Sequence, residues 1–136
     1  PIVHDGIMYL HGPGALVVQA LDAATGELLW EYQHQLPEQM RQRAAGAGLR
    51  GISIYDDKIF VNTFDAQLVA LDARTGTVVW QVQVADPNLG FGFGAGAVIA
   101  NGKVVSALTG CARRFVEEKC AIVAHDARTG KELWRL

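Results

Sequence analysis

The sequence lacks the features that mark membrane-spanning, precursor and nucleic-acid-binding chains. No apolar run approaches the roughly 20 residues that span a bilayer, and the first residues lack the basic and apolar regions of a signal peptide. The 12 basic residues balance 14 acidic ones, with no cluster beyond Arg113-Arg114, which disfavours nucleic acid and anionic membranes as partners. Half of the residues are apolar and the net charge is -2, as is typical of a soluble globular protein.

Cysteine is also scarce, and its two copies lie close together. Cys111 and Cys120 bracket an irregular segment. A disulfide between them would imply an oxidising compartment such as the periplasm. Two free buried thiols are the alternative that the sequence leaves open.

The sequence does contain one short motif in three copies. It reads ALDAATGELLW from Ala20, ALDARTGTVVW from Ala70 and AHDARTGKELW from Ala124. Successive copies of its aspartate are 50 and 54 residues apart, whereas the distance from aspartate to tryptophan is constant. A repeat of this period is typical of a propeller or a solenoid.

The motif itself predicts two antiparallel strands joined by a tight turn. Apolar runs flank a short polar stretch in which Asp folds its carboxylate onto the turn amides and Gly takes a positive φ. The Trp then falls at a fixed place on the returning strand, opposite a small Ala. Three tryptophans at one register indicate an indole that lies flat on a neighbouring repeat, where its N–H needs an acceptor.

Turn signals divide the whole chain into three all-β repeats. They span residues 1–32, 50–84 and 95–136, and each contains four short antiparallel strands. Residues 33–49 are expected to connect the first two repeats and to contain one helical turn. Because the chain begins inside a strand pattern and ends two residues after its third Trp, we expect further repeats on both sides.

Three other patterns have simple structural interpretations. His4 and His11 have no cysteine or carboxylate cluster beside them, so we interpret them as surface or turn residues. Asp56-Asp57 begins a tight turn, where backbone amides satisfy carboxylates. Residues 91–96 alternate Gly with Phe and lead into a strand pattern, which excludes a phosphate-binding loop. Such alternation indicates close approach of the backbone to a neighbouring repeat or to a ring-shaped ligand.

The topology of a meander places the unusual segments on one face. The connection into each repeat and the loop between its second and third strands share a face, and the Asp-Thr-Gly turns lie on the other. Residues 33–50, 85–94 and 109–119 therefore collect on the same side. Short turns on one face and long loops on the other are typical of a scaffold that presents a site.

The repeated motif A-x-D-x-x-T-G-x-x-x-W resembles the tryptophan-docking motif of the PQQ-dependent (quinoprotein) alcohol dehydrogenases. The resemblance covers nearly the whole chain. It implies an all-β fold in which the three four-stranded blades form an arc of a larger, eight-bladed β-propeller.

The resemblance also implies a small set of cofactor-binding residues. Arg50-Gly51 matches an Arg-Gly whose guanidinium points at PQQ, and a planar donor fork suits carboxylates and quinone oxygens. Thr109, Gly110 and Cys111 match the start of the family's Ser-Gly-Ala-Glu stretch, whose first residues contact a PQQ carboxylate. The family's metal-binding Glu falls on Ala112, and a methyl group does not coordinate calcium or a lanthanide ion. The family's adjacent cysteine pair is also missing, and the metal stays unknown.

The function implied by this resemblance is periplasmic oxidation of a small alcohol by hydride transfer to PQQ. A c-type cytochrome is the implied electron acceptor, although the sequence contains no C-x-x-C-H haem motif. The family's catalytic Asp and the Trp under the cofactor lie in later blades, so we name no catalytic residue and expect this piece alone to be inactive. The alternative is a non-catalytic propeller that acts as a protein-binding scaffold or sensor domain, which the Ala at position 112 favours.

Overall fold

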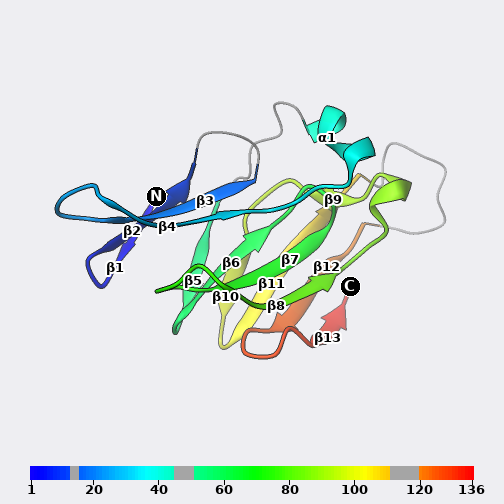
Figure 1. Cartoon of the computed structure of the whole chain (residues 1–136). Coiled ribbons are helices and arrows are strands. Elements are labelled where there is room, and N and C mark those ends of the chain that lie inside the picture. Colours follow the sequence, from blue (N-terminus) through cyan, green and yellow to red (C-terminus); the bar gives the residue numbers. More distant parts are fainter. Residues whose placement is uncertain (13–15, 45–50, 111–119) are drawn as a thin grey trace.

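The chain forms three antiparallel sheets that lie side by side (Figure 1). The computed structural model describes residues 1–12, 16–44, 51–110 and 120–136. Within each sheet the strands follow one another in sequence order, so each sheet is a meander. The three predicted four-stranded antiparallel sheets are thereby confirmed.

The strand bounds of the sheets follow the three repeats. The first sheet contains β1 (Ile2–His4), β2 (Ile7–His11), β3 (Val17–Asp22) and β4 (Leu28–Gln33). The second contains β5 (Ser53–Tyr55), β6 (Lys58–Asn62), β7 (Gln67–Asp72) and β8 (Val78–Gln83). The third contains β10 (Val98–Ala100), β11 (Lys103–Thr109), β12 (Ile122–Asp126) and β13 (Glu132–Arg135).

Three further elements lie in the connections between the sheets. Helix α1 (Glu38–Ala44) follows β4 and is longer than the single turn predicted there. The short helix η1 (Pro87–Leu89) follows β8. The two-residue strand β9 (Gly92–Phe93) pairs with the end of β11, a contact that the sequence did not predict. No helix in the described ranges is long and apolar enough to cross a membrane.

The three Asp-Thr-Gly turns share one geometry. In the second sheet, Asp72 Oδ1 accepts hydrogen bonds from the amides of Arg74 and Thr75, both at 2.9 Å. Asp22 and Asp126 make the same contacts in the other sheets. Hydrogen bonds of this kind stabilise the ionised carboxylate, so the pKa of Asp72 is lowered, chiefly by the Thr75 amide.

Each of the first two tryptophans lies on the turn of the next sheet. Trp30 faces Ala20 across its own sheet, and its Nε1 donates to the carbonyl of Ala73, 3.0 Å away. Trp80 donates to the carbonyl of Ala127 at 3.2 Å in the same way. The expected acceptor of the indole N–H is thus present in both contacts.

Glycine is required beneath each of these indoles. Gly76 has φ +72°, and a Cβ built on it would lie 2.5 Å from Cε3 of Trp30. A Cβ on Gly130 would lie 2.8 Å from two ring carbons of Trp80. Because real Cβ atoms do not approach this closely, only glycine lets the indole lie flat on the turn.

Two apolar cores fill the spaces between the sheets. The core between the first and second sheets includes an aromatic pair, Tyr9 and Trp30, with ring centroids 6.0 Å apart. The core between the second and third sheets includes the equivalent pair, Phe60 and Trp80, at 5.8 Å. Tyr9 also donates its hydroxyl to the carbonyl of Ala73. Successive sheets therefore bury their faces on each other through the same kind of contact.

We predict that Gly76→Ala destabilises the fold more than Gly6→Ala does. Both glycines have a positive φ, +72° and +76°, so each Ala costs about 1–2 kcal/mol of backbone strain. Only Gly76 lies under an indole, and nothing lies within 4 Å of a Cβ on Gly6, so overpacking adds about 1–3 kcal/mol at position 76 alone. Urea unfolding followed by Trp fluorescence measures the difference, and equal midpoints for the two variants would contradict the contact.

Candidate functional site

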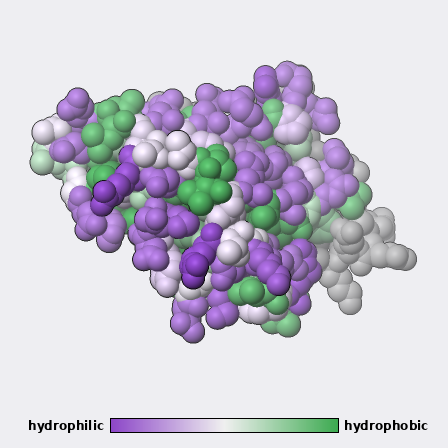
Figure 2. Space-filling view, turned by 60° about the horizontal axis from the view of Figure 1, so that its bottom comes forward, coloured by the Kyte–Doolittle hydropathy of each residue, from purple (hydrophilic) through white to green (hydrophobic). Residues whose placement is uncertain are grey.

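The connections between sheets lie on one side of the molecule, opposite the short turns. Figure 1 shows α1 and the segment that contains η1 on the upper side, and the turn between β12 and β13 on the lower side. Figure 2 brings the lower side forward and shows a mainly hydrophilic surface with small, separate apolar patches. The side that carries α1, η1 and the ends of β6 and β11 is the candidate functional face.

Two of the four predicted cofactor-binding residues, Arg50 and Cys111, lie outside the described residues, as does Ala112. Thr109 is described and exposed at the end of β11. Its Oγ1 donates to the carbonyl of Gly92, 3.1 Å away, and its backbone pairs with Gly92 in the ladder. The hydroxyl is therefore anchored and retains lone pairs for a further donor.

Gly110 brings the connection that follows β8 against the end of β11. It has φ +101°, and a Cβ built on it would lie 2.0 Å from the carbonyl oxygen of Gly90. No other residue type fits there without moving the backbone. Thr109 and Gly110 are thus held by the segment from Gly90 to Gly92.

Close backbone approach also joins the second and third sheets near their first strands. Gly51, which directly follows Arg50, has φ +95°, and its Cβ would lie 3.1 Å from Cα of Gly96. A Cβ on Gly92 would lie 2.5 Å from the carbonyl oxygen of Phe64, in the turn between β6 and β7. Close approach to a neighbouring repeat therefore explains the glycine in β9. This was one of the two interpretations of the alternating Gly and Phe in residues 91–96.

A buried polar network, which the sequence did not reveal, connects the first sheet to the second on the same face. His34 follows β4 and is 6% exposed, and Asp65 lies in the turn after β6 and is 1% exposed. Nε2 of His34 lies 3.0 Å from Oδ1 of Asp65. Thr63 and Gln67 donate their side-chain hydrogens to the two oxygens of the same carboxylate. Every carboxylate oxygen of Asp65 thus has a partner.

The ionisation of this network follows from its contacts. Burial raises the pKa of Asp65, but the hydrogen bonds from His34 and Thr63 outweigh it, so the pKa of Asp65 is lowered. Burial, with the charge of Asp65, raises the pKa of Tyr32 to about 12. The protonated hydroxyl of Tyr32 lies 3.2 Å from Nδ1 of His34. The ionised carboxylate of Asp65 can only accept, so Nε2 of His34 donates to it.

A second polar contact ties the second sheet to the third. Ser106 donates its hydroxyl to Oδ1 of Asn62, 3.0 Å away, and Nδ2 of Asn62 donates to the carbonyl of Ala95 at 2.8 Å. Ala95 is the position that corresponds to Arg50 in the preceding repeat, directly before a glycine and a first strand. Buried polar groups therefore fix the backbone beside the predicted cofactor-binding residues.

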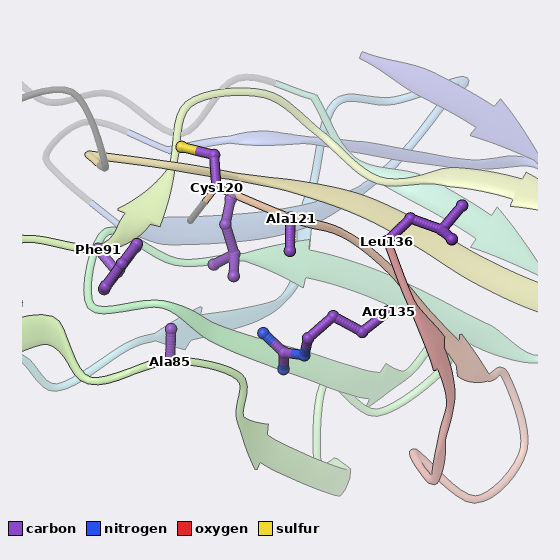
Figure 3. A pocket seen from close by; sticks show the side chains of 7 residues that line it. Ala85, Phe91, Cys120, Ala121, Arg135 and Leu136 are labelled. Atoms are coloured by element: carbon purple, nitrogen blue, oxygen red, sulfur yellow. The ribbon is translucent and has the colours of Figure 1, made fainter. Parts of the chain in front are cut away.

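A cavity of about 360 Å³ lies beside this face, next to the end of β13 in the third sheet (Figure 3). Its walls are mostly apolar, and Arg135 supplies the one guanidinium, whose Nη2 donates to the carbonyl of Val84 at 2.9 Å. Of the predicted cofactor-binding residues that the structure describes, neither Thr109 nor Gly110 lines it. The residues that line it are Ala85, Phe91, Leu108, Cys120, Ala121, Arg135 and Leu136.

Metal ligands and the predicted disulfide are judged from the described residues alone. Among them, no group of three or more His, Cys, Asp or Glu side chains is arranged to hold a metal ion. Cys120, the one cysteine among the described residues, is not free. Because Cys111 lies outside the described residues, its bridge to Cys120 stays a prediction.

Comparison with protein families identifies the group to which this chain belongs. The family model described as glucose/ethanol/alcohol dehydrogenase, β-propeller domain, of the PQQ group, matches residues 1–136. The chain belongs to the quinoprotein alcohol dehydrogenase family. This match confirms the resemblance of the repeated motif to the tryptophan-docking motif of that family.

Individual relatives are much longer than this chain. The quinoprotein alcohol dehydrogenase PedH of Pseudomonas putida is 38% identical over 134 residues, which are 98% of this chain and 22% of PedH. The solved quinohemoprotein alcohol dehydrogenase ADHIIG of Pseudomonas putida superposes with a TM-score of 0.81 at 38% identity, over 100% of this chain and 20% of that one. A europium-containing methanol dehydrogenase superposes with a TM-score of 0.80 at 26% identity, over 98% of this chain and 23% of that one. The chain spans about a fifth of the length of these proteins.

We predict that Asp65→Asn lowers stability at neutral pH and that the difference disappears in acid. The amide loses charge-assisted hydrogen bonds worth about 1.5–3 kcal/mol. Because the folded-state pKa of Asp65 lies below its ordinary value of 3.8, the wild-type advantage is present above that value and is lost as the pH falls through the folded-state pKa. Urea midpoints measured from pH 7 to pH 2 check the trend.

The matched control is Asp5→Asn, in an exposed turn where the aspartate has a positive φ that asparagine tolerates. We expect this variant to unfold at the wild-type midpoint at every pH. A gap between wild type and Asp65→Asn that stays constant into acid would show that the carboxylate charge plays no part in the network.

Proposed function

We propose that this chain forms three blades of a larger, eight-bladed propeller in a PQQ-dependent dehydrogenase that oxidises small alcohols. The observation that carries the proposal is the match of the quinoprotein family model over residues 1–136. The similarity to longer alcohol dehydrogenases supports it, because the chain aligns with about a fifth of each. We further propose that the protein is periplasmic and transfers electrons to a c-type cytochrome.

The described residues fit a flat, anionic cofactor on the candidate face. Thr109 is exposed there, and its neighbours Gly94 and Gly110 add no side-chain bulk. The backbone on both sides is fixed by the contacts of Thr109 with Gly92 and of Gly110 with Gly90. We propose that Thr109, Gly110 and Cys111 contact a carboxylate of PQQ, and that Arg50 contacts its carboxylate or quinone oxygens.

When bound, PQQ supplies the oxidising chemistry by accepting a hydride from the alcohol. The role of this chain is to bind and orient the cofactor. The close approach of Gly51 to Gly96 holds the segment that begins at Gly51 against the third sheet. A site supported in this way is preorganised, which lowers the entropy lost on binding.

Ala112 is the clearest difference from the family pattern. Hard cations such as calcium bind oxygen ligands, and Ala112 supplies none. Glu117 and Glu118 follow in the same segment and are the nearest carboxylates in the sequence. We therefore leave the metal ion unassigned and propose that its first carboxylate ligand differs from that of the family.

We predict that full-length protein binds PQQ and oxidises primary alcohols, and that Arg50→Ala weakens PQQ binding roughly tenfold or more, because it removes charge-assisted hydrogen bonds. Arg50→Lys keeps the charge without the planar fork, so it should restore only part of the affinity. PQQ absorbance in the presence of calcium or a lanthanide ion measures binding, and dye reduction measures turnover. Arg74→Ala, in a turn on the opposite face, is the control and should behave as wild type.

The outcomes separate the function from the placement of the cofactor. Wild-type protein that neither binds PQQ nor turns over would refute the dehydrogenase and favour the non-catalytic propeller. Wild-type binding that is unchanged in Arg50→Ala would leave the enzyme intact and refute the assigned position of PQQ.

We also predict a disulfide between Cys111 and Cys120 in protein made in an oxidising compartment. Such a short loop should contribute somewhat less than the ~3 kcal/mol estimated for a loop of 15 residues. Alkylation followed by intact-mass measurement, with and without reductant, counts the free thiols. Two alkylated cysteines in unreduced periplasmic protein would argue against both the bridge and the compartment.

A further inference from the structure

The turn between β6 and β7, residues 63–67, contacts two segments of the candidate face. Phe64 of this β6–β7 turn packs against Leu36 and Met40, in the connection that contains α1. The carbonyl oxygen of Phe64 lies against Gly92 of β9, where a Cβ would approach to 2.5 Å. Figure 1 shows α1 and β9 on the same, upper side of the molecule. The turn therefore joins the connection after β4 to β9.

The carboxylate of Asp65 holds this turn from within. It accepts hydrogen bonds from Nε2 of His34 at 3.0 Å and from the side chains of Thr63 and Gln67. Thr63 and Gln67 belong to the turn itself, whereas His34 follows β4. The backbone N–H of His34 donates to the carbonyl of Leu16 at 3.0 Å, so the ring starts from a fixed backbone. His34 therefore ties the turn to the first repeat.

The turn has a backbone conformation that needs this support. Ala66 is fully buried and has φ +58°, in the left-handed region that residues with a Cβ disfavour. The N–H of Val84 donates to its carbonyl at 2.9 Å, and Nε2 of Gln83 donates to the carbonyl of Asp65 at 2.6 Å. Such a conformation persists only where the surroundings fix it. Without the side-chain contacts of Asp65, we expect the turn to relax.

Strand β9 connects the position of this turn to Thr109. The N–H of Phe93 donates to the carbonyl of Thr63 at 3.4 Å, beside the close approach of Gly92 to Phe64. Strand β9 also pairs with the end of β11, and the carbonyl of Gly92 accepts the hydroxyl of Thr109 at 3.1 Å. Because β9 has only two residues, its position depends on these neighbours. A shift of the turn therefore reaches the Thr109 hydroxyl.

We propose that His34 and Asp65 are positioning residues for the cofactor contact of Thr109. The pair fixes the β6–β7 turn, the turn fixes β9, and β9 orients the hydroxyl of Thr109 on the candidate face. His34 and Asp65 are 6% and 1% exposed, so they act through Thr109 and not on the cofactor itself. The inference rests on the proposed function, in which Thr109 contacts a carboxylate of PQQ. A hydroxyl that is already oriented loses less entropy on binding.

The first test needs no cofactor and measures hydrogen exchange of the Phe93 amide in the full-length protein. His34→Phe keeps a ring of similar size and removes the donor to Asp65, so we expect this amide to exchange about tenfold faster. His34→Gln retains an N–H donor close to the position of Nε2 and should exchange within about twofold of wild type. Circular dichroism shows whether each variant is folded, and Asp65→Asn replaces His34→Phe if that variant does not fold.

The matched control is Gly76→Ala, which weakens the contact between the same two sheets on the opposite face. It lowers stability without touching the β6–β7 turn or β9. We expect its Phe93 amide to exchange as in wild type and its PQQ affinity to be unchanged. A general loss of stability is thereby distinguished from a loss of position.

The second test measures PQQ affinity, in the presence of calcium or a lanthanide ion, at a temperature at which every variant is folded. We expect His34→Phe to weaken binding about tenfold and His34→Gln to restore most of the affinity. Thr109→Val removes the hydroxyl. In this background His34→Phe should cause no further loss, because residues that act through one another are not additive.

The outcomes distinguish this inference from the proposed function. Wild-type protein that binds no PQQ would refute the proposed function, and exchange of the Phe93 amide would then decide the coupling alone. Unchanged exchange in His34→Phe would overturn the inference. So would an unchanged PQQ affinity in this variant, or an equal loss of affinity with and without the Thr109 hydroxyl.

Discussion

The contact between an indole and a glycine turn is the interaction on which the arrangement of this molecule depends. An isolated four-stranded meander has two faces and little to define how it meets its neighbour. The Trp30 ring, lying on Gly76 with its N–H on the carbonyl of Ala73, fixes both the distance and the lateral position of the second sheet. Trp80 repeats the contact on the third sheet. Apolar burial supplies the stabilisation, and the indole contact selects one arrangement from many.

The same arrangement positions the candidate site on the opposite face. Once the turns on one side are locked, the connections on the other side are brought together, and glycine lets them approach closely. Gly51 contacts Gly96, and Gly110 contacts Gly90. The buried pair of His34 and Asp65 adds a polar tie between the first two sheets near this face. Rigid sheets thus carry loops whose chemistry can differ among relatives without altering the scaffold.

How much of this could be predicted from the sequence depends on how local each feature is. The turns and strands were predictable because Asp, Thr, Gly and Trp act within eleven residues of one another. Strand β9 was missed because it has two residues and pairs with β11 out of sequence order. The pair of His34 and Asp65 was missed because it joins two repeats through residues 31 positions apart that belong to no repeated pattern. The match to the family's Ser-Gly-Ala-Glu stretch predicted Thr109 as a binding residue. It did not predict the hydrogen bond from its hydroxyl to the carbonyl of Gly92.

Hydrogen exchange of the three indole N–H groups, followed by NMR of the chain labelled with ¹⁵N-tryptophan, measures whether the indole contacts join successive sheets. We expect slow exchange for Trp30 and Trp80, whose N–H groups are bonded to the next sheet, and fast exchange for the exposed Trp134. Equally fast exchange of all three would contradict the claim that indole contacts hold successive sheets together.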